Sequence, residues 1–235
     1  MLTDIFSSFD PAINSMHSTS PMLFWAMNFI ILTLISSSYW LNYSRFLQVL
    51  FLSKSIMFEQ STRTAGNHLK GFTPIMTTLF CLIIIMNMSG LIPYSFSTTS
   101  HLYFTLTFGL TMWFTLILSS LFNSPSTFTA QLLPGGAPDW LNPFLVLIET
   151  TSLSVRPITL SFRLGANMTA GHVVMTLISA YGAPTMFTSV TLAVISLSIQ
   201  AFYILFEMGI CIIQAYIFTL LLTLYADEHT HWKSV

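Results

Sequence analysis

A few ionisable and polar side chains interrupt two long apolar segments in the second half of the chain. They are Glu149, Arg156, Arg163, Asn167, His172, Glu207 and Gln214. Glu and His can take up and release protons near neutral pH when burial changes their proton affinity, whereas Arg stays charged. The set therefore predicts two proton paths that a permanently positive Arg163 separates. A mobile carboxylate supplied by a partner would carry the proton past that barrier.

The spacing of the first group places its members on one side of a helix. Glu149, Arg156 and Arg163 are seven residues apart each, and Asn167 follows one helical step later. Residues three, four and seven apart share a helix face, so an unbroken helix would carry these groups as one stripe. His172 comes nine residues after Arg163, about half a turn round the helix, and is expected to point elsewhere.

The second group predicts where the two segments meet. Glu207 and Gln214 are also seven apart and share a face of the last segment. With a turn near residue 185, Arg163 and Glu207 would lie at similar depth. A plain ion pair between them is one alternative to a proton path, since buried ion pairs also occur in proteins for structural reasons.

The other residues have structural alternatives of their own. His172 could be a satisfied core histidine, and Gln214 could be a hydrogen-bonding group between two helices. Glu149, near the start of its segment, could be an interfacial residue. Arg156 lies beside Pro157 and could reach the membrane surface with its long side chain, and no functional role is assigned to it.

The composition determines the environment of these residues. The chain has seven Lys or Arg and eight Asp or Glu among 235 residues, so 6% are charged against roughly 25% in a soluble domain. With 54% hydrophobic residues the chain cannot make a water-soluble surface, and the lipid bilayer is its expected solvent. The net charge of −1 excludes a basic nucleic-acid-binding field. Cys81 and Cys211 lack a metal-binding spacing, so no metal and no cofactor is predicted.

The apolar pattern predicts an all-α integral membrane protein with a single domain, 1–235. About five helices should cross the membrane, together with one amphipathic surface helix. Because basic residues stay on the inner side, the segment with Arg45, Lys54, Arg63 and Lys70 faces inward. The predicted parts are a first span at 22–43, this basic surface segment at 44–71, a helical hairpin at 72–123, and a long hairpin at 143–226.

The last hairpin is too long to cross the membrane upright. Its two segments, 143–181 and 186–226, would measure about 58–61 Å as helices, whereas the hydrocarbon core is about 30 Å thick. They must therefore be strongly tilted or broken, and Pro157 could bend the first of them. The sequence Gly182-Ala183-Pro184 is the expected turn between them.

The N-terminal sequence indicates a protein that is inserted without cleavage, in a bacterium or inside an organelle, and the 13 Met with many Ser and Thr favour synthesis in an organelle. It carries Asp4 and Asp10 and has no Lys or Arg before Arg45, whereas secretory signals are basic at the start and transit peptides are rich in Arg. Counting the crossings places the N-terminus outside and the C-terminus inside.

Four motifs, in order, resemble one family. Residues 161–172 (SFRLGANMTAGH) resemble the RLxxNxxAGH signature of subunit a of the F-type ATP synthase, in its mitochondrial form. Residues 87–94 (NMSGLIPY) and 147–154 (LIETTSLS) resemble two further family segments. Glu207 followed by residues 213–221 (IQAYIFTLL) resembles a fourth. The first 70 residues match the family only in their general pattern, which is one span followed by a basic surface helix.

The resemblance implies a role for each matching residue. Arg163 would be the essential arginine that faces the carboxylates of the rotating c-ring. His172 and Glu207 would belong to the outer half-channel and Glu149 to the inner one, with Asn167 and Gln214 as polar neighbours of the arginine.

The resemblance also implies the setting of this proton path. The chain would be a non-catalytic stator subunit in the mitochondrial inner membrane, with its N-terminus in the intermembrane space and its C-terminus in the matrix. Its partners would be the c-ring, the peripheral stalk and other Fo membrane subunits, and protons would be its only substrate. The family fold also has two long, nearly horizontal last helices.

Three other classes of protein make different demands on these residues. A cytochrome subunit would need several intramembrane His or Cys ligands, and only His172 lies well inside a predicted span. A secondary transporter usually shows internal repeats, and none is visible. A structural membrane scaffold would tolerate replacement of its buried charges by apolar residues.

Overall fold

The computed structural model describes residues 45–92, 97–133 and 139–229, together with Phe9, Ala26 and Thr33. All regular elements in this described part are helical, which confirms the predicted all-α class. The α-helices are α2 (Arg45–Arg63), α3 (Phe72–Gly90), α4 (Leu102–Asn123), α5 (Pro125–Gln131), α6 (Asn142–Thr188) and α7 (Val190–His229), with short 3-10 turns η2 (Ala65–His68), η3 (Thr98–Ser100) and η4 (Asp139–Leu141). The predicted span 22–43 lies outside the described residues except for Ala26 and Thr33.

Three of the described helices, α3, α4 and α7, are long and apolar enough to cross a membrane. Helix α6 is longer still but more polar, because it carries Glu149, Arg156 and Arg163 as well as Asn167 and His172. The helix boundaries follow from local chemistry. Gly71 adopts φ 84° before α3, a left-handed conformation that glycine adopts without steric cost. Pro125 separates α4 from α5 and occupies the first turn of α5, where no backbone N–H is needed.

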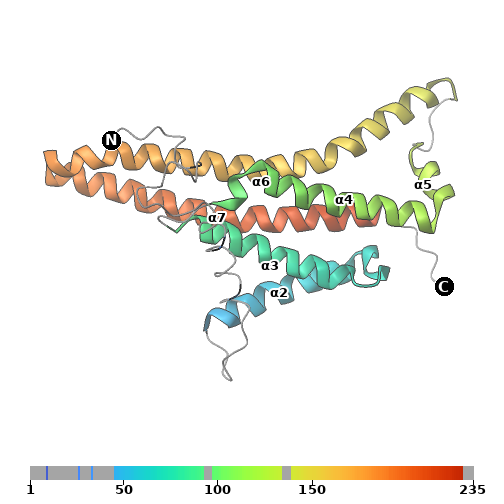
Figure 1. Cartoon of the computed structure of the whole chain (residues 1–235), viewed down its shortest axis with the longest axis horizontal. Coiled ribbons are helices and arrows are strands. Elements are labelled where there is room, and N and C mark those ends of the chain that lie inside the picture. The colour runs from blue at the N-terminus through green and yellow to red at the C-terminus, as the bar shows by residue number, and fades with distance from the viewer. Residues whose placement is uncertain are drawn as a thin grey trace.

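Helices α6 and α7 run antiparallel, side by side, along the longest axis of the molecule (Figure 1). With 47 and 40 residues, they are about 70 and 60 Å long at 1.5 Å per residue. Helix α4 packs against both, and α3 packs against α7. Figure 1 also shows that the first part of α6, drawn in yellow, turns away from the remainder of the helix. Pro157 explains this bend because it removes one backbone hydrogen bond inside α6.

The turn between the last two helices is not where the sequence suggested. Helix α6 continues through Gly182 and Pro184 to Thr188, and the chain reverses at Ser189, so the predicted Gly182-Ala183-Pro184 turn is wrong. Ser189 is extended, with φ −160° and ψ 147°. Its hydroxyl accepts a hydrogen bond from the Leu192 N–H at 3.4 Å, and its carbonyl accepts one from Ala193 at 3.1 Å. Serine is a preferred N-cap, and this capping starts α7.

The core lies where α2, α3, α4, α6 and α7 meet. Met57, Met76, Leu164 and Leu222 are among its most buried side chains. The Thr219 hydroxyl of α7 is 3.4 Å from the Met57 sulfur of α2, which ties the basic segment to the last helix. This core fixes the hairpin of α6 and α7 against the rest of the chain.

Candidate functional site

Arg163 lies on the face of α6 that the rest of the described chain leaves uncovered. Its side chain is exposed, and so are Thr159, Ala166 and Ala170 on the same face and the adjacent Phe162. All ion pairs among the described residues involve Arg156, and none involves Arg163. The structure therefore presents a permanent cation on an apolar helix face without a carboxylate partner from the described part of the chain.

The contacts between α6 and α7 show which residues face one another. The Cys211 and Met168 sulfurs are 3.6 Å apart, and Gly171 directly contacts the Glu207 carboxylate. Because Gly171 lies two turns beyond Arg163, about 12 Å along α6, Glu207 is not opposite the arginine. The ion pair between Arg163 and Glu207 is thus not formed, because the turn lies at Ser189 and not near residue 185. In this register Gln214, which is half-buried, lies across from the arginine's turn.

Glu207 occupies a closely fitted position between the two helices. Its side chain is 1% exposed, and neither carboxylate oxygen has a hydrogen bond of normal geometry within the described residues. A Cβ atom at Gly171 would overlap this carboxylate. The Tyr203 hydroxyl donates to the Gly171 carbonyl oxygen at 3.4 Å, one turn of α7 before Glu207. A glycine at position 171 is therefore a requirement for the position of Glu207.

Replacing Gly171 by Ala should displace Glu207 while leaving its chemistry intact. The added methyl group would overlap the carboxylate, and overpacking of this kind typically costs about 1–3 kcal/mol. If Glu207 carries protons, Gly171→Ala should reduce the rate of proton transport by the assembled synthase. This rate is measured as the acidification of membrane vesicles, reported by a pH-sensitive dye. Gly182→Ala is the matched control, because the nearest atom to its added Cβ is 3.8 Å away. Equal activity of both variants would contradict this requirement.

Polar groups from several elements meet where α3, η3 and α6 pack together. His172 is half-buried and its ring lies beside Gly90 of α3, so it points away from the exposed face of Arg163, as predicted. Turn η3 packs against α6 and α3 and brings a run of buried hydroxyl groups. Several buried polar atoms of α3, η3, α6 and α7 have no hydrogen-bond partner among the described residues: Asn87 Oδ1, Thr98 Oγ1, Thr99 Oγ1, His172 Nε2 and both Glu207 oxygens.

Buried polar atoms are usually hydrogen-bonded to protein or water. These polar groups and the Glu207 carboxylate are thus suited to line an aqueous path between α3, α6 and α7. Sequence reasoning missed the hydroxyl run, Ser97-Thr98-Thr99-Ser100. The available signal was an uninterrupted hydroxyl sequence directly after an apolar span.

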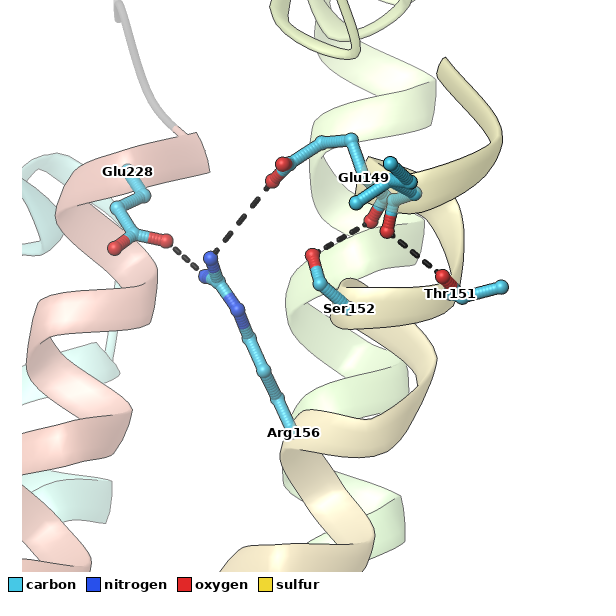
Figure 2. Close-up of polar contacts among 6 residues, drawn as sticks. Glu149, Thr151, Ser152, Arg156 and Glu228 are labelled. Atoms are coloured by element: carbon cyan, nitrogen blue, oxygen red, sulfur yellow. Dashed lines mark hydrogen bonds and ion pairs between the residues drawn. The ribbon is translucent and has the colours of Figure 1, made fainter. Parts of the chain in front are cut away.

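A second polar cluster lies at the other end of the hairpin. Figure 2 shows the Arg156 guanidinium between Glu149 of α6 and Glu228 of α7. Arg156 Nη2 is 3.9 Å from Glu149 Oε1, and its Nη1 donates to Glu228 Oε2. The guanidinium also lies 5.2 Å from the centre of the Tyr225 ring. Arg156 therefore forms ion pairs with two carboxylates. The sequence-based interpretation, in which its long side chain only reaches the membrane surface, does not account for these contacts.

A cavity of about 360 Å³ adjoins this cluster. Glu149, Arg156 and Glu228 line it together with Gln131 of α5 and three apolar residues. The seven-residue spacing of Glu149 and Arg156 correctly predicted their shared face. Glu228 was missed because it belongs to the polar end of the chain, although the predicted inward C-terminus was a signal for it.

Asn167, on the arginine's turn of α6, is half-buried.

Taken together, these features define a class. The chain is an all-helical membrane protein with a long helical hairpin that carries a buried carboxylate, an exposed arginine and an ionic cluster at three successive positions. The sequence profile of the family described as "ATP synthase A chain" matches residues 18–227. The chain therefore belongs to the ATP synthase subunit a family, as the motifs predicted.

Individual relatives support this membership. The chain is 37% identical over 230 residues to ATP synthase subunit a of Locusta migratoria, 38% over 230 residues to that of Aedes aegypti, and 39% over 231 residues to that of Drosophila simulans. Each alignment covers 97% of this chain and 99% of the relative. The chain is accordingly a proton-transporting component of a mitochondrial ATP synthase, and its apolar helices belong in the inner membrane.

Proposed function

We propose that the chain is the stator of the Fo sector and forms two offset proton half-channels against a rotating c-ring, with Arg163 between them. The exposed arginine carries this proposal. A charge at membrane depth costs about 2.5–3.5 kcal/mol on insertion scales and is a functional group by default. The uncovered face around Arg163 is apolar, so a partner that supplies a carboxylate there would compensate the charge.

The two polar clusters supply the two half-channels in this proposal. Protons enter from the outer side past His172 and the hydroxyl groups of η3 to Glu207. On the inner side they leave through the cavity lined by Glu149. The position of Gly171, two turns from Arg163, offsets the outer path from the arginine along the hairpin. Asn167 and Gln214 provide polar surroundings for the arginine's turn.

Rotation follows from the charge of the ring carboxylate. A proton delivered from Glu207 neutralises that carboxylate, which can then move into lipid. After nearly a full turn the ring carboxyl reaches the inner path and releases its proton toward Glu149. Arg163 keeps the returning carboxylate ionised and prevents a proton from passing directly between the two paths. The membrane potential supplies about 2.3 kcal/mol per charge per 100 mV and sets the direction.

The proposal also fixes partners and orientation. The c-ring covers the face of Arg163, while the peripheral stalk and other Fo membrane subunits bind elsewhere on the chain. The N-terminus lies in the intermembrane space and the C-terminus in the matrix, because the inner cluster includes Glu228 close to the C-terminal end. The chain contributes the proton path and has no catalytic site of its own.

A cross-linking experiment tests this arrangement in the assembled synthase. Ala166→Cys places a thiol on the exposed face, one turn from Arg163, in a chain whose Cys81 and Cys211 are buried. A cysteine scan of the ring helix that bears the carboxylate should yield a disulfide with Ala166→Cys under mild oxidation. Leu52→Cys on α2 is a matched control, since Leu52 is 63% exposed and lies on another helix. Cross-links from Leu52→Cys and none from Ala166→Cys would overturn the proposed interface.

A further inference from the structure

We propose that Arg156 is a positioning residue of the inner half-channel, a shared counter-ion that moves between Glu149 and Glu228 as each proton leaves. This inference rests on the proposed function of Glu149 as the inner proton acceptor. It assigns a role to two residues, Arg156 and Glu228, that the family resemblance leaves without one.

The geometry provides one cation for two carboxylates from different helices. Arg156 and Glu149 are seven residues apart on α6, while Glu228 lies in the last turn of α7 (Figure 2). The guanidinium is hydrogen-bonded to Glu228 and stands 3.9 Å from Glu149, beyond hydrogen-bonding distance. The structure thus corresponds to the arrangement in which Arg156 is hydrogen-bonded to Glu228, while Glu149 keeps only the longer ion-pair contact and can receive a proton.

The charge of the cluster suits this exchange. With both carboxylates ionised, the three side chains carry a net charge of −1, and one proton brings the cluster to neutrality. A guanidinium has several N–H donors in a rigid fork, so it can turn from one carboxylate to the other without losing all its hydrogen bonds. Arg156 can therefore follow the proton's arrival and departure with a small side-chain motion.

The surroundings permit such a motion. The side chains of Glu149, Arg156 and Glu228 are 38%, 24% and 43% exposed, and the adjoining cavity of about 360 Å³ has room for water. From α5 the cluster is faced by Gln131, and from α7 by Tyr225, whose ring supports the guanidinium. Asp227 is engaged elsewhere, since it accepts a hydrogen bond from the Ala65 N–H at 2.5 Å.

The proposed step is a proton transfer with no other chemistry. The ring carboxylic acid gives its proton to ionised Glu149 while Arg156 remains bound to Glu228. Glu149 then passes the proton to water in the cavity and becomes ionised again. The guanidinium turns toward Glu149 at that moment and returns to Glu228 when the next proton arrives.

The test measures how the rate depends on pH on the inner side. Inverted inner-membrane vesicles containing the assembled synthase expose this side to the medium, so that ATP-driven proton pumping can be followed against medium pH. Arg156→Gln changes the cluster charge from −1 to −2. We expect the rate to fall about two- to fivefold, the range of a partly exposed ion pair, with the pH dependence displaced to higher pH because the added negative charge retains protons.

Two further variants separate this role from a structural tie between α6 and α7. Glu228→Gln brings the cluster charge to 0, and we expect a displacement to lower pH. The double variant Arg156→Gln with Glu228→Gln restores a charge of −1 and should recover the wild-type pH dependence, although the tie between the helices is lost. A purely structural tie predicts that the double variant behaves like Arg156→Gln and that no profile moves.

An unmoved pH profile in Arg156→Gln and in Glu228→Gln would overturn the inference. If Arg156→Gln does not assemble, Glu228→Gln alone decides, since it must move the profile to lower pH. Arg163→Ala, measured in the same vesicles, distinguishes a failure of this inference from a failure of the proposed function. Loss of coupled pumping in Arg163→Ala with unmoved profiles refutes only the role of Arg156, whereas normal pumping in Arg163→Ala refutes the proposed function itself.

Discussion

Replacing Arg163 by Ala should abolish ATP synthesis driven by a proton gradient. The arginine is exposed on an apolar face, and no carboxylate among the described residues pairs with it. Its proposed partner is the ring carboxylate, which would lose its counter-ion in the variant. A compensation worth about 2.5–3.5 kcal/mol at membrane depth corresponds to a change in rate of roughly 70- to 400-fold. ATP production by energised vesicles is the measurement, with assembly of the synthase checked on native gels.

Two comparison variants make this result specific. Arg163→Lys keeps a positive charge but loses the planar fork, so it should retain more activity than Arg163→Ala while remaining impaired. Arg45 is exposed at the start of α2, and Arg45→Ala should leave synthesis within about twofold of wild type, as expected for a surface charge. ATP synthesis by Arg163→Ala at the wild-type rate would refute the role of the arginine.

Replacing Glu207 by Gln should block proton entry from the outer side. Gln has nearly the same shape and fits the space beside Gly171, but it cannot take up and release a proton. Positioned proton-transfer groups typically contribute about 10²–10⁴-fold in rate, so a loss of about 100-fold in both ATP synthesis and pumping is expected. The measurement is proton uptake by vesicles at fixed membrane potential.

A control for Glu207→Gln lies in the same chain. Glu59 is exposed on α2, and Glu59→Gln removes the same chemical group from a position outside both polar clusters. It should leave proton uptake unchanged within about twofold. If the chain were a structural scaffold, Glu207→Gln and Glu207→Leu would both assemble and transport protons normally, and this outcome would contradict the outer path.

The residues that we propose to carry the chemistry could be singled out from the sequence because charges are so rare in it. The seven-residue spacing of Glu149 and Arg156 predicted a shared helix face, and their side chains do meet. Helix type followed from the long apolar segments, since the membrane requires internally satisfied backbone hydrogen bonds. The local sequence pattern was sufficient to predict which side chains meet wherever they belong to one helix.

Arrangements between helices could not be read in the same way. The turn was placed at Gly182-Ala183-Pro184 because Gly and Pro usually end helices, yet packing holds α6 together through both, and Ser189 caps the next helix. That shift of a few residues moved Glu207 from Arg163 to Gly171. Glu228 was overlooked because its partner, Arg156, is 72 residues away in sequence and only the completed hairpin joins them.

The central claim is that Arg163 separates two proton paths, and proton leak through a locked ring tests it most directly. The ring is first fixed to the chain by a cysteine cross-link so that rotation cannot carry protons. Passive proton flux is then measured in vesicles under an imposed potential. We expect no flux when Arg163 is present and a measurable leak in Arg163→Ala, because the barrier between the paths is gone. Equal flux with and without Arg163 in the locked state would contradict it.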